Sequence, residues 1–239
     1  MKRVLFLLVF SALLQASGQH NFQKVDREAI RLSVTDSSSA GYYPRLLSRF
    51  NDFDTTLTLN DYRLLYYGFV FQPGYSAYGD IRTKEIQESI GAKKYMEASL
   101  TIDSVLAKVP ISLRANYQKA VALYLMDSLS MPYPEYILRY NKLVGAILSS
   151  GDGLTCETAF KTIFVADEYE IIYRHFAIEK VGGQALVYPC DRMTVTPNNR
   201  FTKTSLYFDT SDSFNQMKTL FPESTKPKKE KRKKDKRKG

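Results

Sequence analysis

The sequence predicts an α+β protein with an N-terminal helical layer, a small antiparallel β-meander and a short C-terminal helix. Two observations predict this class. Apolar residues recur at helical spacing from residue 22 to residue 148, and the spacing changes to alternation beyond residues 149–153. Helices that are segregated from strands, with strands that follow one another through short turns, are typical of α+β proteins.

The helical layer is predicted to begin with two short helices. Residues 22–32 have an amphipathic pattern, which the Ser- and Gly-containing run at 37–41 ends. Residues 43–50 form the second helix, with Pro44 in its first turn, where a missing backbone N–H is tolerated.

The segment 57–79 is the part of the chain that is densest in large side chains. Thr58 is predicted to cap a helix, with Asp61 as its partner in a capping box, and Pro73-Gly74 is predicted to end the element. One helical face is expected to lie in the core, because apolar side chains recur on it at helical spacing. That face carries Leu59, Tyr62, Tyr66 and Phe69, and the other aromatics of the segment are Tyr67, Phe71, Tyr75 and Tyr78.

The tyrosines of this segment have two interpretations. In the first, they belong to the core, and Tyr67, Tyr75 and Tyr78 direct their hydroxyls toward the surface. In the second, the loop from Gln72 to Gly79 presents Tyr75 and Tyr78, with Gln72, as a binding surface, because aromatic side chains are favoured at interfaces.

Three further helical regions are predicted at 82–90, 93–125 and 134–148. The middle one is a helical hairpin whose two arms are separated by Pro110. Its Tyr-x-Glu-Ala element, ending at Ala98, resembles the junction between two tetratricopeptide repeats, where small alanines let neighbouring helices approach. A generic helical hairpin is the alternative interpretation.

Alternating apolar residues after position 153 predict the strands of the meander. An acidic turn at Asp167 and Glu168 separates the first two, and a short helix capped by Asp209 or Ser211 follows the last and extends to Phe221. The predicted strands are 161–166, 169–176, 184–190, 192–196 and 201–208.

The N-terminus has the features of a secretory signal. Lys2 and Arg3 precede an apolar run at 4–14 that is too short to span a bilayer, and small residues at 16–18 predict cleavage after about Gly18. No later stretch is predicted to cross a membrane, so we expect an exported protein, periplasmic or extracellular. The predicted organisation is a signal peptide at 1–18, a helical region at 19–150, a β region with its terminal helix at 151–222, packed on the helices as one domain, and a disordered basic tail at 223–239.

The net charge of +9 comes from the two ends of the chain. Residues 226–239 hold ten Lys and Arg against two acids, a balance of +8, and Lys2 with Arg3 adds +2. The rest has 22 basic and 23 acidic residues, a charge of −1, so the body offers no basic surface for nucleic acid. The tail fits anionic lipid or lipopolysaccharide, or else is a solubilising extension. Its candidate contact residues are Lys228, Lys229, Lys231, Arg232, Lys233, Lys234, Lys236, Arg237 and Lys238.

Cys156 and Cys190 are the two cysteines of the chain. In an oxidising compartment they are a disulfide candidate that closes a loop of about 35 residues, worth roughly 4 kcal/mol on the chain-entropy model. The alternative is two buried free thiols, which pack as small hydrophobic side chains. Their spacing does not decide between the two.

Side chains suited to catalysis are few. His175 is the one histidine in the predicted folded body, and a strand places it on one face with Ile171 and Tyr173, which is more typical of a structural histidine. Asp167 and Glu168 are the catalytic candidates beside His175, because paired carboxylates serve acid–base hydrolysis when one is desolvated. Turn acids that face water are the commoner case. No metal-ligand, phosphate-loop or nucleophile motif is present, so no metal site and no cofactor are predicted.

Four segments together resemble a known family: YYPRLLSRF, LNDYRLLYYGFVFQPGYSAYG, AFKTIFVADEYEIIYRHF and SLYFDTS. They are similar to a family of secreted Bacteroides-type proteins identified as domain of unknown function 4919. The resemblance covers nearly all of the predicted mature domain, and its tyrosine-rich segment is the most specific part. It implies a secreted or cell-envelope location in a Gram-negative bacterium and no particular mechanism.

The predicted function is that of a noncatalytic exported protein that binds a protein or cell-envelope component, with the basic tail directed to anionic surfaces. The alternative is a hydrolase that uses the acids near Asp167 with His175. Export and the near-neutral body disfavour nucleic acid as a partner.

Overall fold

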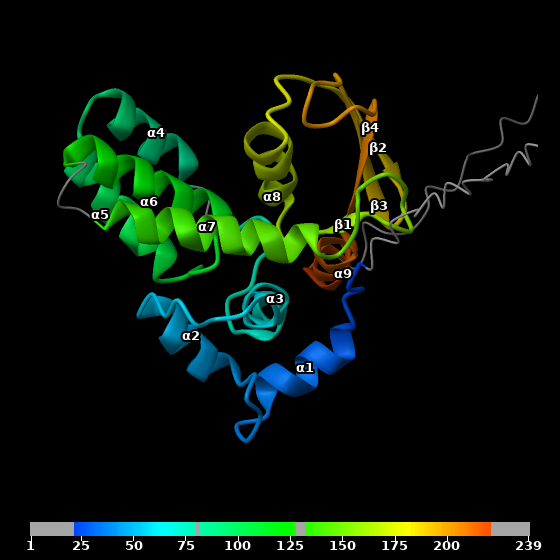
Figure 1. Cartoon of the computed structure of the whole chain (residues 1–239), viewed down its shortest axis with the longest axis horizontal. Helices are drawn as coiled ribbons and strands as arrows, with labels where there is room; N and C mark the ends of the chain where they lie inside the picture. The colour runs from blue at the N-terminus through cyan, green and yellow to red at the C-terminus, as the bar shows by residue number, and fades with distance from the viewer. Residues whose placement is uncertain (1–21, 80–81, 128–131, 221–239) are drawn as a thin grey trace, which may run out of the picture.

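The computed structural model describes residues 22–79, 82–127 and 132–220 (Figure 1). The predicted signal peptide at 1–18 and the basic tail at 223–239, with its candidate contact residues, lie outside this part of the chain. The described residues form a helical layer, a small four-stranded sheet and a terminal helix, and the predicted α+β class is confirmed.

The helical layer contains the helices predicted between residues 22 and 148. Within the ranges described above, no helix is both long and apolar enough to cross a membrane. The helices are α1 (Arg27–Thr35), α2 (Tyr43–Asn51), α3 (Leu59–Gly68) with a 3-10 turn (Phe69–Phe71), α4 (Thr83–Gly91), α5 (Tyr95–Leu106), α6 (Leu113–Met126) and α7 (Tyr133–Leu148).

Side-chain caps fix where several of these helices begin. The Asp26 carboxylate accepts hydrogen bonds from two backbone N–H groups, so α1 begins at Arg27 and not at residue 22. The predicted capping box of α3 is confirmed: the Thr58 hydroxyl accepts from the Asp61 N–H, and the Asp61 carboxylate accepts from the Thr58 N–H. At the start of α6 the Ser112 hydroxyl accepts from the Ala115 N–H, shortly after Pro110, which separates α5 from α6.

α5 and α6 pack on each other as a helical hairpin. They share a small apolar cluster with α4, made of Ile86, Ile102, Val105, Ala115 and Ala122, which is separate from the main core. The resemblance of this hairpin to tetratricopeptide repeats remains a prediction.

The sheet is mixed, with strand order β1-β4-β3-β2. β2 (Val181–Val187), β3 (Cys190–Val195) and β4 (Ser205–Asp209) form an antiparallel meander, as predicted. The bounds predicted as 184–190, 192–196 and 201–208 are corrected: the first turn lies at Tyr188-Pro189, inside the first predicted strand, and the last strand begins at Ser205. The sequence did not predict the short β1 (Phe160–Lys161), which pairs parallel to β4. The terminal helix α9 (Ser211–Leu220) follows β4 directly, as predicted.

The two strands predicted at 161–166 and 169–176 are wrong, apart from Lys161, which lies in β1. The chain instead forms the short helix α8 (Val165–Glu170), which continues into a π-helical turn (Ile171–His175). Buried apolar residues at alternate positions are typical of a strand. Here the same pattern arises in a helix, because α8 buries side chains on two opposite sides.

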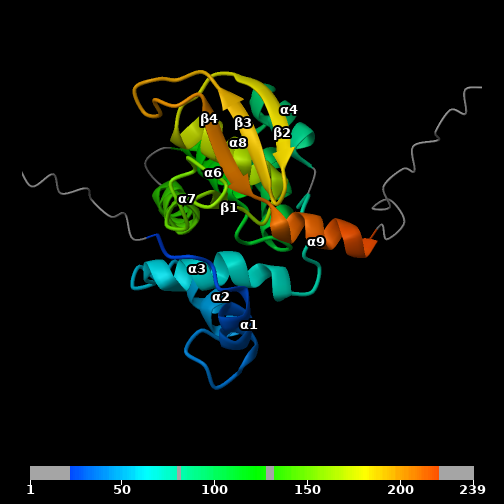
Figure 2. The ribbon, with the colours of Figure 1, turned by 90° about the vertical axis from the view of Figure 1, so that its right-hand side faces the viewer.

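α8 lies between the sheet and the helical layer, as Figures 1 and 2 show. One face of the sheet packs against α8 with buried Met193 and Leu206, whereas Arg192 and Thr194 on the opposite face are exposed. This alternation is expected of a sheet that is covered on one side only. As a result, α8 is a central element although it has only six residues.

The main core is centred on the aromatic segment. Tyr62, Tyr66 and Phe69 are buried as predicted, and Tyr67 is buried too. The expectation that the Tyr67 hydroxyl points to the surface is wrong, because this hydroxyl is buried and donates to the Ala146 carbonyl at 3.2 Å. Leu59, which was expected on the same face, is 43% exposed, because it is the first residue of α3 and lies at the helix end.

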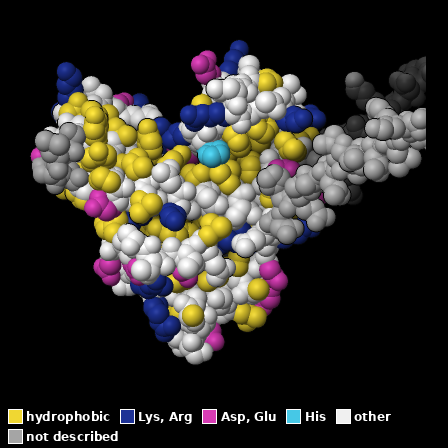
Figure 3. Space-filling model, viewed as in Figure 1, with side chains coloured by type: hydrophobic (Ala, Val, Ile, Leu, Met, Phe, Trp, Pro, Cys, Tyr) yellow, Lys and Arg dark blue, Asp and Glu magenta, His cyan; other side chains and the backbone are white. Residues whose placement is uncertain are grey.

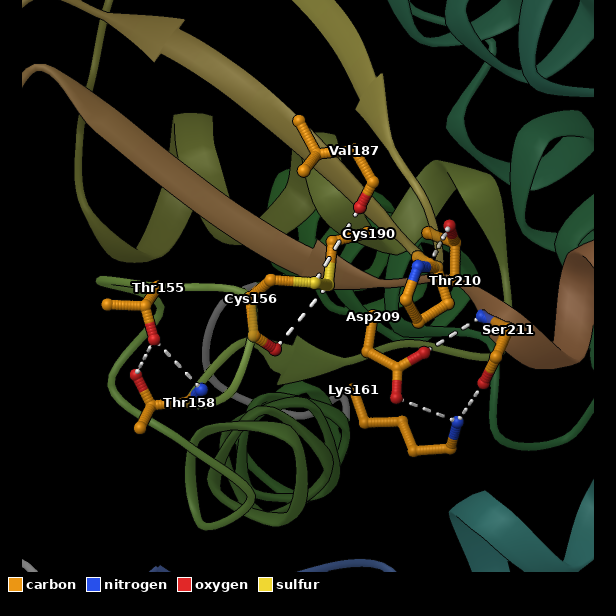
Figure 4. The surroundings of a disulfide bond; sticks show 10 residues. Thr155, Cys156, Thr158, Lys161, Val187, Cys190, Asp209, Thr210 and Ser211 are labelled. Carbon is orange, nitrogen blue, oxygen red and sulfur yellow. Dashed lines mark hydrogen bonds and ion pairs between the residues drawn. A yellow bond between two sulfur atoms is a disulfide. The ribbon is translucent and has the colours of Figure 1, made fainter.

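A disulfide joins Cys156 to Cys190, with an S–S distance of 1.96 Å (Figure 4). It links the loop before β1 to the first residue of β3. The loop itself is tightly folded at Gly151, where an added Cβ would lie 2.1 Å from the Thr158 carbonyl oxygen. The bridge therefore anchors a compact loop to the sheet.

Replacing Cys156 and Cys190 together with serine is expected to lower the free energy of unfolding by about 2–4 kcal/mol, because the bridge closes a long loop in the unfolded chain. Urea unfolding followed by circular dichroism measures this loss. Wild type in a reducing agent should match the double variant. Equal stability of oxidised and reduced wild type would contradict the prediction.

Candidate binding pocket

Three of the acids on α8 are buried. Asp167, Glu168 and Glu170 are 2%, 0% and 4% exposed. The expectation that Asp167 and Glu168 face water in a turn is wrong, because α8 is covered on both sides. Burying a charge without a partner costs several kcal/mol, so each of these carboxyl groups must either be protonated or be paired with a cation.

Asp167 is held by a tyrosine from the aromatic helix. The Tyr66 hydroxyl donates to Asp167 Oδ2 at 2.6 Å and accepts from the Ile163 N–H at 3.2 Å. Burial raises the pKa of Asp167 to about 8, against the lowering effect of the Tyr66 hydrogen bond. Asp167 is therefore neutral at pH 7. Since Oδ2 accepts the tyrosine hydrogen, the proton of the neutral acid belongs on Oδ1.

Glu168 points in a different direction, toward the sheet. Neither of its carboxyl oxygens has a hydrogen-bond partner among the described residues. Burial, followed by the nearby carboxyls of Asp191 and Asp167, raises the pKa of Glu168 to about 9. The Gln184 amide donates to Asp191 Oδ2 at 2.9 Å. Glu168 is therefore buried as the neutral, protonated acid, which avoids the cost of burying an unpaired charge.

Glu170 is paired with two arginines. Arg114 Nε lies 2.7 Å from one carboxylate oxygen and Arg174 Nε lies 2.6 Å from the other. The Arg174 guanidinium also lies over the Tyr117 ring, 3.9 Å from its centroid. Glu170 therefore neutralises part of the positive charge of Arg114 on α6 and Arg174 in the π-helical turn.

A cavity of about 40 Å³ lies where α8 meets α4, α5 and α6. Ile86, Val105, Ala115 and Phe164 supply apolar lining, and Asp167, Arg114 and Gln118 supply polar lining. The remaining lining residues are Tyr78, Gly79, Thr83, Val109 and Ser112. The cavity thus lies between the small apolar cluster of α4–α6 and the main core.

Gln118 and Asp167 supply polar groups that border the cavity. Gln118 is 6% exposed, and its side chain lines the cavity. Asp167 lines it as well, and its Oδ2 is the oxygen that accepts from Tyr66. The mixture of polar and apolar side chains around one cavity is typical of a ligand-binding pocket.

Only one of the three predicted binding residues reaches this cavity. Tyr78 is 54% exposed, and its hydroxyl donates to Met217 Sδ at 3.2 Å. Tyr75 is tied down, because its hydroxyl donates to the Ile163 carbonyl at 2.6 Å. Gln72 donates to the Gly68 carbonyl at 3.4 Å and does not line the cavity.

His175 does not join the acids. It lies exposed at the end of the π-helical turn, with its ring edge on Phe176, and not on a strand face with Ile171 and Tyr173. Its carbonyl accepts a hydrogen bond from Arg200. Within the described ranges, no group of three or more His, Cys, Asp or Glu side chains is placed to hold a metal ion.

Sequence reasoning missed Gln118, Arg114 and Tyr66 as parts of a site. Gln118 and Arg114 lie on the second arm of the predicted hairpin, far from Asp167 in the chain. No motif joins them, and only the packing of α6 against α8 brings them together.

The fold and the cavity define an α+β protein in which a buried short helix presents a neutral acid to a small, partly polar pocket. A family model described as Domain of unknown function (DUF4919) matches residues 28–219, and the chain belongs to this family. The family resemblance seen in the sequence is thereby confirmed. No curated protein and no solved structure matches the chain significantly.

Replacing Glu168 with Gln is expected to change how stability depends on pH. The folded-state pKa of Glu168 is raised, so folded protein keeps a proton that the unfolded chain releases. The contribution of Glu168 to stability is therefore fully present below about pH 4 and is lost as the pH rises toward 9. Glu168→Gln removes this loss and should stabilise the protein by about 4–5 kcal/mol at pH 8, with little change at pH 4.

Chemical denaturation at pH 4, 6 and 8 measures the effect. Glu88→Gln is the matched control, because the Glu88 side chain is 68% exposed and its replacement should change stability by no more than about 0.5 kcal/mol. Parallel pH profiles for Glu168→Gln and wild type would show that Glu168 is ionised in the folded protein.

Proposed function

We propose that this chain is an exported binding protein that holds a small neutral group of a protein or cell-envelope component in the pocket beside Tyr78. The observation that carries the proposal is the cavity itself, in which the polar side chains of Gln118 and Asp167 lie beside apolar side chains. The predicted secretory signal supports export.

The charge of the pocket favours a neutral ligand. Asp167 is protonated at pH 7, so the pocket lining offers no carboxylate to a cation, and Arg114, the cationic side chain of the lining, is already paired with Glu170. A neutral carboxyl and an amide each donate and accept, which suits a hydroxyl or a carboxamide. The cavity volume of about 40 Å³ admits one such group, with its carbon against Phe164 and Ile86.

Tyr78 supplies the surface on which the rest of the ligand would rest. Its ring is half exposed beside the cavity, and tyrosine combines a large apolar face with a hydroxyl. Aromatic side chains of this kind are enriched at binding interfaces. The pocket therefore determines which chemical group of the ligand binds, and Tyr78 adds contact area for the rest of the ligand.

The basic tail would attach the protein to an anionic surface. Residues 226–239 carry ten Lys and Arg, and each such residue near an anionic membrane contributes on the order of 1 kcal/mol. On the face of the body that Figure 3 shows, basic and acidic side chains are scattered between apolar and neutral ones, and no continuous cationic surface is visible there. Anionic lipid or lipopolysaccharide is the proposed partner of the tail.

The alternative is a hydrolase that uses Asp167 as general acid. Its raised pKa, at the edge of a cavity, is the observation that favours this function. Glu168 faces the sheet and His175 lies at the surface, so neither supplies a second catalytic group beside Asp167.

A photo-crosslinking amino acid placed at position 78 of the exported full-length protein is expected to capture a discrete partner in cells. Gln118→Leu should reduce the yield at least about fivefold, because the buried amide loses its hydrogen bonds to the ligand. Position 124 is the matched control, since Tyr124 is also exposed, at 53%, and does not line the cavity.

A version ending at Pro222 should keep this crosslink and lose only salt-sensitive attachment to anionic vesicles. Equal crosslinking from positions 78 and 124, or no effect of Gln118→Leu, would remove the pocket from the binding site.

Asp167→Asn separates the two functions. The amide keeps the shape and stays neutral at every pH, so a binding protein keeps its crosslink. Wild type loses the crosslink as pH rises through about 8, where Asp167 ionises, whereas the variant should not. A hydrolase instead loses its turnover with Asp167→Asn while its fold is retained, which a screen of ester and glycoside substrates measures.

A further inference from the structure

The outer edge of the sheet at β2 carries backbone groups that nothing in the described chain pairs. β2 is the last strand in the order, and alternate residues of an edge strand direct their N–H and C=O groups away from the sheet. Among the described residues, Val181–Val187 forms backbone ladder contacts with β3 only. The Val187 carbonyl lies 3.7 Å from Cys156 Sγ, a disulfide sulfur with no hydrogen to donate.

β2 has few of the features that protect natural edge strands: its one irregularity is a register shift in the pairing with β3 between Val181 and Gly183. It is seven residues long, with the sequence VGGQALV, and contains neither a charged side chain nor a proline. The opposite edge, β1, is only two residues long and is protected by its shortness. Leu186 is 57% exposed and Val187 is 42% exposed, so the unprotected edge is also apolar.

An aromatic surface lies beside this edge, on the face of the sheet that α8 covers. The strand register places Leu186 opposite Asp191, which is buried on that face. The Tyr169 hydroxyl donates to Gln184 Oε1 at 3.3 Å, so the Tyr169 side chain reaches β2. Tyr173 stacks on Tyr169, with ring centroids 6.0 Å apart, and is 46% exposed. Tyr173 and Leu186 thus offer apolar area next to unpaired backbone.

We propose that β2 binds an extended, uncharged segment of another polypeptide, which pairs with it as an additional strand. The backbone of the segment satisfies the outward N–H and C=O groups of β2. Its alternate side chains, on the α8 side, are apolar and rest on Tyr173 and Leu186. The side chains between them face water and are polar.

The length of the segment is set by the ends of β2. At one end, α9 contacts the hairpin: Tyr188 packs on Phe214, with ring centroids 5.9 Å apart, and Lys218 Nζ lies 3.4 Å from the Tyr188 hydroxyl. At the other end, Lys180 introduces charge. The segment therefore pairs over about five to seven residues, because the regular register of β2 runs from Gly183 to Val187 and the strand itself begins at Val181.

A peptide segment fits this edge better than a second copy of the chain. Antiparallel pairing of β2 with itself sets Gly182 and Gly183 of one copy against the larger residues near Leu186 of the other. Such a contact is poor in side chains, and stable interfaces bury about 1,000 Å² or more. A peptide with side chains at every position fills the open space beside Gly183, where an added Cβ meets no atom within 4 Å.

The test uses the full-length mature protein and a fluorescein-labelled peptide, acetyl-Thr-Val-Thr-Val-Thr-Val-Thr-amide, followed by fluorescence anisotropy. Saturable binding is expected. Two control peptides carry N-methyl groups on alternate residues in opposite frames, and only the frame that faces β2 should lose binding, by at least about tenfold.

Gly183→Lys places a charge on the edge and should weaken binding at least about tenfold. Gly91→Lys is the matched control, because an added Cβ at Gly91 also meets no atom within 4 Å and the residue ends α4, away from the sheet. Hydrogen exchange should show protection of alternate amides of β2 when the peptide binds.

Three results would overturn the proposal. The first is the absence of saturable binding, and the second is equal binding of both N-methylated frames, which indicates apolar adsorption. The third is a wild-type dimer in light scattering that Gly183→Lys dissociates, which would assign the edge to a second copy of the chain.

Discussion

The Tyr66 hydroxyl is the contact on which the arrangement of the layers depends. It donates to Asp167 on α8 and accepts from the Ile163 N–H just before α8, so one atom of α3 fixes two points of the neighbouring segment. Tyr66 and Asp167 are both almost fully buried, and a shift of α8 would leave three polar groups without partners. The orientation of α8 determines, in turn, which of its acids faces the pocket and which faces the sheet.

A helix that is covered on both sides cannot direct its polar side chains to water, and α8 shows three solutions to this constraint. Asp167 is protonated and bonded to Tyr66, Glu168 is protonated without a partner among the described residues, and Glu170 is paired with Arg114 and Arg174. Only the first leaves hydrogen-bonding capacity directed to a cavity. The pocket and the pH sensitivity of the fold therefore have the same physical origin.

The sequence predicted local structure well where local signals decide it. The capping box at Thr58 and the proline between α5 and α6 determine helix ends through their nearest neighbours in the chain. It failed at α8, because burial on both sides makes a helix resemble a strand in its pattern of apolar residues. The pocket could not be predicted either, since Gln118 and Asp167 meet only through tertiary packing. Spacing likewise left the pairing of Cys156 and Cys190 undecided.

The pocket lies on the boundary between the small apolar cluster of α4–α6 and the main core. Its wall combines Ile86 and Val105 from the first with Phe164 from the second. A group that enters the pocket contacts both, so its binding and the docking of the α4–α6 hairpin region form one coupled equilibrium. The two equilibria are linked reciprocally. A contact that stabilises the docked position of α4–α6 raises the affinity of the pocket for its ligand, and a bound ligand stabilises the docked position of α4–α6 by the same free energy.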